Sequence, residues 1–145
     1  MFKNILLATD GSAASEHAAR LAVQLARENG AKLTALYVVD PYPYLGIGEA
    51  NPLGFQAYMS AAAQHAAEAH GKILALCQGE PAVECQPRLA EDVAAASGIL
   101  QSASQVGADL IVVGSHGRSG VAHLMLGSVA TKVVAESPVP VLVAR

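Results

Sequence analysis

The segment DLIVVGSHGRSGVAHLMLGS, residues 109–128, decides the fold of this chain. Its first residues form an apolar run typical of a buried strand, and the residues from Gly114 to Ser128 include four glycines. A loop that only reverses the chain needs one or two glycines, because a single glycine already supplies the unusual backbone angles of a turn. We therefore interpret this loop as one that lets a ligand approach its backbone.

Three more short runs resemble the strand at 109–114, and each is apolar almost throughout. They lie at 4–9, 32–39 and 139–144. Continuous apolar strands indicate burial on both faces, as in parallel sheets covered by helices on each side. A weaker run at 82–89 alternates polar and apolar residues through Glu84, Gln86 and Arg88, which predicts a strand at the edge of the sheet.

Helical patterns fill the gaps between these runs. Ser12 is expected to cap a helix over 13–29 that ends at Gly30. The apolar face of this helix is predicted to contain Ala18, Leu21, Ala22 and Leu25. Further helices are predicted over 55–78, over 92–105 with Asp92 as the cap and Gly107 as the stop, and over 128–136 before Ser137-Pro138.

The order of these elements is βα repeated four times and closed by a strand. Alternation of this kind predicts an open, parallel α/β sheet with right-handed crossovers and helices on both faces. No repeat or linker divides the sequence, so we expect one domain over residues 1–145. The stretch 41–54 is the one long irregular segment, and it carries no motif that assigns it a role.

Composition excludes several functional classes. The chain is 52% hydrophobic and 14% charged with a formal charge of −3, which argues against disorder and against a broad surface for nucleic acid or anionic membrane. The apolar run at the N-terminus is too short for a signal peptide, and no stretch has the length of a membrane span. We expect a soluble, cytoplasmic protein without nucleic-acid or membrane partners.

The cysteines and histidines show no catalytic or metal-binding pattern. Cys77 and Cys85 are not spaced as C-x-x-C and have no histidine at metal spacing, so free thiols are favoured over a disulfide or a metal site. His116 and His123 flank the glycine loop, but no residue is placed by sequence to form a triad with them. The histidines on predicted helices are interpreted as surface or partly buried residues: His17, His65 and His70. We therefore predict no catalytic residue and no metal ligand.

Three predicted strand ends carry residues suited to ligand binding. They are 10–12 after the first strand, 38–40 after the second, and the glycine loop. In open α/β sheets, ligands bind beyond the carboxyl ends of the strands where the strand order reverses. Ser128 opens a helix and is expected both to cap it and to contact phosphate, because a helix N-terminus offers unpaired N–H groups to a phosphate. Gly114 and Gly117 would let backbone amides reach that anion. The P-loop motif G-x4-G-K-[ST] is absent from the sequence, which argues against a P-loop ATPase.

The loop has the spacing G-x2-G-x9-G-S, and in this context the chain resembles the ATP-binding branch of the universal stress protein family. The resemblance covers the whole chain, through KNILLATDGS, VVDP, DLIVVGSHGRSG, LGSVA and PVPVLVAR. It implies a Rossmann-like, five-stranded parallel sheet in the order 3-2-1-4-5. The strand order would then reverse between the first and fourth strands, beside Asp10 and Gly114.

The resemblance also implies a set of nucleotide-binding residues. Asp10 would lie near the adenosine moiety, the Val38 backbone would contact adenine, and the glycines with Ser128 would contact phosphates. The full set is Ala8, Thr9, Asp10, Val38, Val113, Gly114, Gly117, Arg118, Gly127, Ser128 and Val129. Arg118 is equally well explained as a phosphate clamp or as a solvated charge. Ala8 and Ala130 depart from residues found in some ATP-binding members, and Ala130 implies a weaker contact to one phosphate.

Three functions remain open, in decreasing order of support. The resemblance implies a stress-response regulator or sensor that binds ATP, with Mg²⁺ or Mn²⁺ on the phosphates and at most slow hydrolysis. It also implies a homodimer through the last strand, Val139–Val143, although Pro138 and Pro140 could instead protect the edge of a monomer. The alternatives are an interaction module of the same fold that uses no nucleotide, and an enzyme of related architecture, which this short chain has little room to form.

Overall fold

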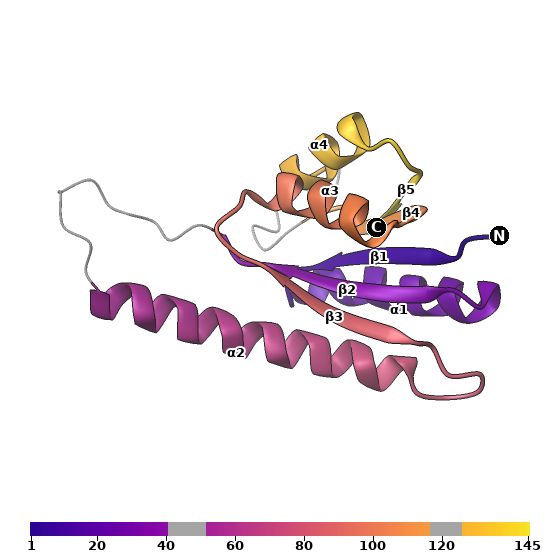
Figure 1. Cartoon of the computed structure of the whole chain (residues 1–145), viewed down its shortest axis with the longest axis horizontal. Coiled ribbons are helices and arrows are strands. Elements are labelled where there is room, and N and C mark those ends of the chain that lie inside the picture. The colour runs from indigo at the N-terminus through magenta and orange to yellow at the C-terminus, as the bar shows by residue number, and fades with distance from the viewer. Residues whose placement is uncertain (41–51, 117–125) are drawn as a thin grey trace.

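The computed structural model describes residues 1–40, 52–116 and 126–145. In these parts of the chain, strands and helices alternate from the N-terminus to the C-terminus (Figure 1). The strands are β1 (Asn4–Thr9), β2 (Lys32–Val38), β3 (Cys85–Ala90), β4 (Leu110–Gly114) and β5 (Val141–Ala144). The helices are α1 (Ala13–Asn29), α2 (Pro52–Cys77), α3 (Ala95–Val106) and α4 (Ser128–Glu136). The predicted order of elements is confirmed.

The five strands form one parallel sheet in the order β3-β2-β1-β4-β5. Helices α1 and α2 cover one face, and α3 with α4 covers the other (Figure 1). The fold class and the strand order that the resemblance implied are thus both confirmed. The weak strand β3 lies at an edge, as its alternating pattern predicted.

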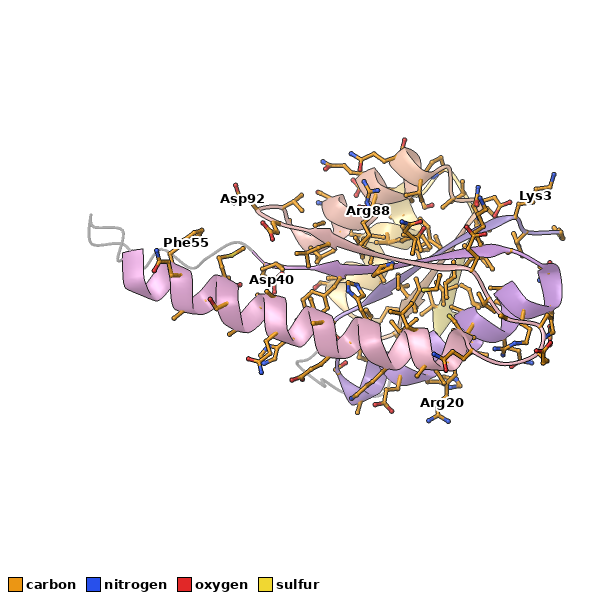
Figure 2. All side chains as sticks on the ribbon, turned by 60° about the horizontal axis from the view of Figure 1, so that its bottom comes forward. Lys3, Arg20, Asp40, Phe55, Arg88 and Asp92 are labelled. Carbon is orange, nitrogen blue, oxygen red and sulfur yellow. The ribbon has the colours of Figure 1, made fainter. Side chains whose placement is uncertain are left out.

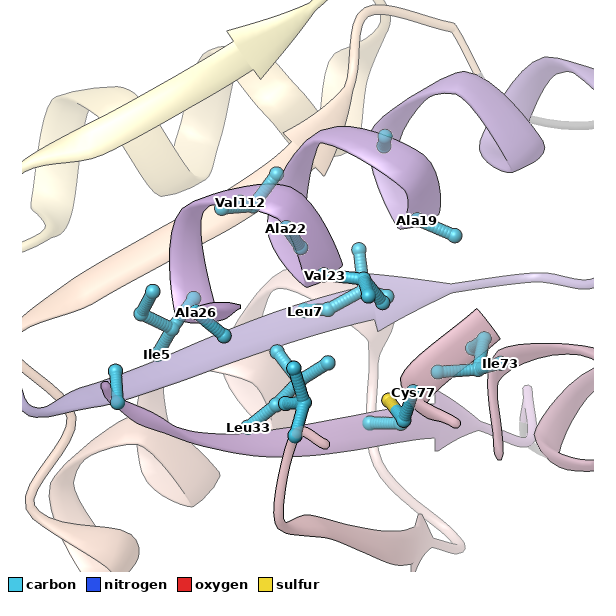
Figure 3. Packing of buried hydrophobic residues seen from close by; sticks show 14 of the residues in the cluster. Ile5, Leu7, Ala19, Ala22, Val23, Ala26, Leu33, Ile73, Cys77 and Val112 are labelled. Atoms are coloured by element: carbon cyan, nitrogen blue, oxygen red, sulfur yellow. The ribbon is translucent and has the colours of Figure 1, made fainter. Parts of the chain in front are cut away.

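The continuous apolar runs are explained by burial on both faces of the sheet. Ile5 and Leu7 of β1 pack with Leu33 and Val112 under α1 and α2 (Figure 3). Residues of opposite parity in the same strands pack under α3 and α4: Leu6, Leu36, Ile111 and Val113. Because successive side chains in a strand point to opposite faces, two helical layers require apolar residues at every position.

The central strands separate at their carboxyl ends. The β1–β4 pairing stops at Leu7 and Val112. By contrast, β1 stays paired with β2 as far as Thr9 and Tyr37, and β4 stays paired with β5 as far as Gly114 and Ala144. The sheet therefore opens between β1 and β4, where the strand order reverses.

Helix α1 has the ends that its sequence predicted. The Ser12 side chain accepts a hydrogen bond from the Ser15 amide, and Gly30 adopts the left-handed conformation with a φ of 64°. The buried face is rotated slightly from the predicted one. Ala18 and Ala22 are buried as expected, whereas Leu21 and Leu25 are only half-buried; the other buried residues are Ser15, Ala19, Val23 and Ala26. Small alanines let the helix lie close to the sheet, so the larger leucines remain at the margin.

The prediction that Asp92 caps α3 is wrong. Helix α3 begins at Ala95, its N-cap residue is Ala94, and within residues 1–40, 52–116 and 126–145 no side chain caps it. Asp92 lies in the preceding turn with a φ of 58°, a conformation that aspartate tolerates better than most residues. The predicted stop at Gly107 is confirmed, since Gly107 has a φ of 67° and its amide donates to Ala103 and Ser104.

Helix α2 extends well beyond the sheet at its N-terminal end (Figure 1). It begins at Pro52, three residues before the predicted start, so the end of the irregular stretch 41–54 belongs to this helix. Residues 41–51 of that stretch lie outside the described residues. None of the helices in the described segments is long and apolar enough to span a membrane.

Candidate functional site

A pocket of about 460 Å³ lies at the carboxyl ends of β1, β2 and β4. It spans the opening between β1 and β4, the position that the reversal of strand order predicts for a ligand. Nine of the eleven predicted site residues line it: Ala8, Thr9, Asp10, Val38, Val113, Gly114, Gly127, Ser128 and Val129. Gly117 and Arg118 lie outside the described residues, as does His123. The fold thus brings three separate sequence segments into one pocket.

Asp10 shapes the turn that joins β1 to α1. Its Oδ1 accepts hydrogen bonds from the Ser12 amide at 2.9 Å and from the Ser12 hydroxyl at 2.5 Å. Gly11 between them has a φ of 76°, which favours glycine. Asp10 therefore acts as a turn former, and it also lines the pocket.

Two buried hydroxyls lie beneath this turn. Thr9 Oγ1 is 3.1 Å from Ser15 Oγ, and it also accepts a hydrogen bond from the Gly11 amide at 3.1 Å. Ser15 in turn donates its hydroxyl to the Ser12 carbonyl at 2.7 Å. The Thr9–Ser15 bond joins β1 to α1 and the other two bonds lie within the turn between them, so together they hold this side of the pocket in a single arrangement.

The N-terminus of α4 forms another side of the pocket. The prediction that Ser128 caps this helix is wrong, because the N-cap is Gly127 and no side chain among the described residues caps the helix. The Gly127 amide donates to the Ser115 carbonyl at 2.7 Å, which joins the end of β4 to the start of α4. Ser128 is the first helical residue. A helix start without a side-chain cap presents backbone N–H groups and a partial positive charge to an anion.

Helix α2 supplies a side of the pocket that the sequence did not indicate. Tyr58, Ala62 and His65 follow each other at helical spacing and all line the pocket, together with Ala61. The Tyr58 hydroxyl donates to the carbonyl of Asp40 at 2.7 Å, which ties α2 to the residues after β2. The spacing was present in the sequence, but an alanine-rich helix shows little contrast between its faces, so it gave no usable signal.

Helix α3 borders the pocket through Ala95 and Ile99. Its N-terminus also lacks a side-chain cap, but the exposed acidic residues Glu91 and Asp92 come just before it. Figure 2 shows Asp92 and Asp40 toward the same end of the sheet, with Lys3 at the opposite end. The carboxylates of Glu91 and Asp92 would repel an anion at the start of α3, so the start of α4 is the better anion site of the two.

His116 lies at the pocket beside the start of the glycine loop. Its Nδ1 is 3.0 Å from the hydroxyl of Ser115, whose backbone amide and carbonyl are also engaged, with Ala144 and Gly127. This contact orients the imidazole at the edge of the pocket. Within the residues that the structure describes, no three His, Cys, Asp or Glu side chains gather where they could hold a metal ion.

The fold and this pocket define an open α/β protein with a ligand-sized pocket at the reversal of strand order. The model of the universal stress protein family matches residues 1–145. A universal stress protein of Thermus aquaticus is 40% identical over 148 residues, covering 100% of both chains. The chain belongs to the universal stress protein family.

Solved structures of other family members share this architecture. The universal stress protein UspA from Lactobacillus plantarum has a TM-score of 0.79 at 28% identity, with 99% of this chain and 97% of that chain covered. A universal stress protein in complex with cAMP has a TM-score of 0.70 at 28% identity, with the same coverage. A further one, from Archaeoglobus fulgidus in complex with dAMP, has the same fold, with a TM-score of 0.69, 21% identity and coverage of 99% and 98%.

Proposed function

We propose that the protein binds an adenine nucleotide, ATP first among them, in the pocket between the ends of β1 and β4. The observation that carries this proposal is the start of α4, which lines the pocket and has no side-chain cap from the part of the chain that the structure describes. The pocket volume of about 460 Å³ falls within the range of about 300–1,000 Å³ usual for small-molecule and cofactor sites. The related structure with cAMP supports an adenine nucleotide as the ligand class.

In this proposal the two ends of the nucleotide bind at different strand ends. The phosphates lie at Gly127, Ser128 and Val129, where helix N–H groups and a hydroxyl donate hydrogen bonds. The adenosine moiety lies toward Asp10 and Val38, as the family resemblance implies. The family resemblance also implies that Gly117 and Arg118 of the glycine loop contact the phosphates.

A metal ion enters this proposal only through the phosphates. Because the described residues hold no cluster of three possible metal-binding side chains, Mg²⁺ or Mn²⁺ would be held mainly by phosphate oxygens. The protein then acts as a stress-response regulator or sensor in the cytoplasm, with at most slow hydrolysis. We assign no catalytic residue, because a positioned general base has not been identified for activating water.

The same proposal includes a homodimer through the last strand. β5 is the edge strand beyond β4, and Val141 and Val143 on it are only half-buried. An apolar edge that is left unpaired favours pairing with a second copy, so the dimer would form along 139–143. Analytical ultracentrifugation tests this part: a dimer that Val141→Lys converts to a folded monomer supports it, and a wild-type monomer contradicts it.

The first experiment measures the nucleotide content of the freshly purified protein by acid denaturation and chromatography. About one adenine nucleotide per chain would support the site and name its ligand. An empty protein that also fails to bind added Mg-ATP would favour the alternative function, an interaction module without a nucleotide.

A charge variant then tests where the phosphates lie. Ser128→Glu places a carboxylate at the start of α4, where it suits the helix but repels phosphate. We expect ATP affinity to fall about tenfold to a hundredfold by calorimetry, with adenosine affinity nearly unchanged. Ala135→Glu is the control, because it adds the same charge at an exposed position near the other end of α4. Equal ATP affinity in the two variants would contradict the phosphate placement.

A further inference from the structure

A second pocket, of about 260 Å³, opens between α1 and α2. It lies behind the β1–α1 turn as seen from the candidate nucleotide site. Thr9, Ser12 and Ser15 line its inner end, next to the backbone of Gly11. The family resemblance and the proposed function assign it no role.

The pocket exists because small side chains face each other across the two helices. Packed helices lie about 8–10 Å apart, and alanines such as Ala19, Ala69 and Ala75 are too short to fill that space. Ile73, which is buried, and the partly exposed Leu76 extend the apolar lining toward the outside. The interior therefore suits an aliphatic chain more than a polar ligand.

The outer rim of the pocket carries charges of both signs with a positive excess. Lys72 Nζ lies 3.6 Å from Glu16 Oε1, in a solvent-exposed ion pair. Arg20 also belongs to the rim, one helical turn after Glu16, and Figure 2 shows it extending outward beyond the helices. Arg20 and Lys72 carry two positive charges and Glu16 one negative charge, so the rim has a net charge of about +1 that can attract an anionic ligand. This arrangement complements an apolar chain that ends in a single negative group.

We propose that this pocket is a second ligand site, which takes a short-chain or medium-chain aliphatic carboxylate. The chain lies between Ala19, Ala69 and Ile73, and the carboxylate lies at the rim with Arg20 and Lys72. The volume of about 260 Å³ is below the range of about 300–1,000 Å³ usual for drug-sized ligands, so the site suits a smaller ligand than the first pocket does.

The two sites share a common partition. Thr9 and Ser15 line both pockets, and their hydroxyls are 3.1 Å apart within the hydrogen-bonded β1–α1 junction. Because the hydrogen-bonded Thr9 and Ser15 side chains separate the two pockets, a ligand in one pocket does not extend into the other. The carboxylate and the adenine nucleotide can therefore be bound together, and the second site does not depend on the first being occupied.

Titration with octanoate, followed by protein NMR, tests the proposal. We expect saturable binding with shifts at Ala19, Ile73 and Leu76, and an affinity that rises about threefold to fourfold per methylene from butyrate to octanoate. Ala75→Trp should weaken octanoate binding at least tenfold by filling the pocket. Ala67→Trp is the matched control, because Ala67 is exposed on α2 and lines neither pocket. Its affinity should stay within about twofold of the wild type.

The charge at the rim is tested by removing both cations. The double variant Arg20→Gln, Lys72→Gln should bind octanoate at least fivefold more weakly but bind octanol as the wild type does. Binding that does not saturate, that ignores Ala75→Trp, or that Mg-ATP displaces competitively would overturn the proposal. A protein that failed to bind ATP but bound octanoate as described would refute the proposed function and leave the second site standing.

Discussion

Gly98 of α3 lies directly against Val38 of β2, one of the residues that line the candidate nucleotide pocket. A Cβ atom added at Gly98 would be 3.4 Å from both methyl groups of Val38 and 2.9 Å from Cγ1 of Val93. The second distance is shorter than real Cβ contacts allow. The missing side chain at Gly98 is thus what leaves room for Val93, while the contact with Val38 would remain an ordinary one.

Gly98→Ala should destabilise the protein. Overpacking of a buried contact costs about 1–3 kcal/mol, which outweighs the gain of about 1 kcal/mol from replacing glycine by alanine in a helix. Because Val93 must shift and Val38 need not, ATP affinity should stay within about twofold of the wild type. Urea unfolding and calorimetry measure the two effects.

Gly71→Ala provides the matched control for this substitution. Gly71 lies within helix α2, and a Cβ there would meet nothing within 4 Å. We expect this variant to gain about 0.5–1 kcal/mol of stability. Adding Val93→Ala to Gly98→Ala should recover most of the lost stability, and equal gains from both glycine substitutions would refute the close-approach argument.

His70 should make stability depend on pH. Its Nε2 is buried and lacks a hydrogen-bond partner within the described residues. Burial lowers the pKa of His70 below its ordinary value of 6.5, and hydrogen bonds with the backbone of Ala35 and Arg88 offset part of this effect. The folded protein therefore prefers the neutral imidazole. The stability that His70 contributes in this form is fully present above pH 6.5 and is lost as the pH falls toward the lowered pKa.

Urea unfolding at pH 7.5 and pH 5 checks this prediction. The free energy of unfolding should fall more between these two pH values in the wild type than in His70→Gln. His17→Gln, at an exposed position on α1, should keep the wild-type dependence. An identical pH dependence in all three proteins would show that His70 is not responsible.

Cys85 should be unreactive in the folded protein. Burial raises the pKa of its thiol to about 12, with further increases from the charge of Cys77 and a hydrogen bond to it; burial also raises the pKa of the Cys77 thiol. At pH 8 the thiolate fraction of Cys85 is then more than about a thousandfold smaller than that of an ordinary thiol. Both cysteines are free thiols, as the sequence predicted.

Reaction with Ellman's reagent measures this protection. We expect slow reaction of the native protein and rapid release of two thiols per chain in urea. The single variants Cys77→Ala and Cys85→Ala assign the rates to each residue. Fast, stoichiometric labelling of Cys85 without denaturant would contradict the effect of burial.

Local signals in the sequence predicted the elements and their alternation. Ser12 and Gly30 bound α1 as expected because their effects involve only the adjacent backbone. Asp92 and Ser128 were expected to cap α3 and α4 but do not, since the N-cap residues of these helices are Ala94 and Gly127. A cap depends on the φ and ψ angles of the chain that enters the helix, which the identity of one residue does not fix.

The candidate site was predictable only in part. Segments around Asp10, Val38 and Gly114 were placed together because parallel strands carry their carboxyl ends to one edge of the sheet. Tyr58 and His65 were missed because they reach the pocket through the position of α2, which is set by packing over β2 and β3. That packing joins residues far apart in the sequence.

The sequence by itself determined the sheet, the order in which helices and strands follow, and the family to which the chain belongs. These follow from local patterns. Burial on both faces requires continuous apolar strands, and a glycine-rich loop after a strand leaves its backbone open to a ligand. Only the tertiary structure decided that β1 and β4 separate after Leu7 and Val112, and that alanines on α1 and α2 leave a second pocket. Both features depend on how closely elements distant in the chain pack against one another, and side-chain volumes settle that only after folding.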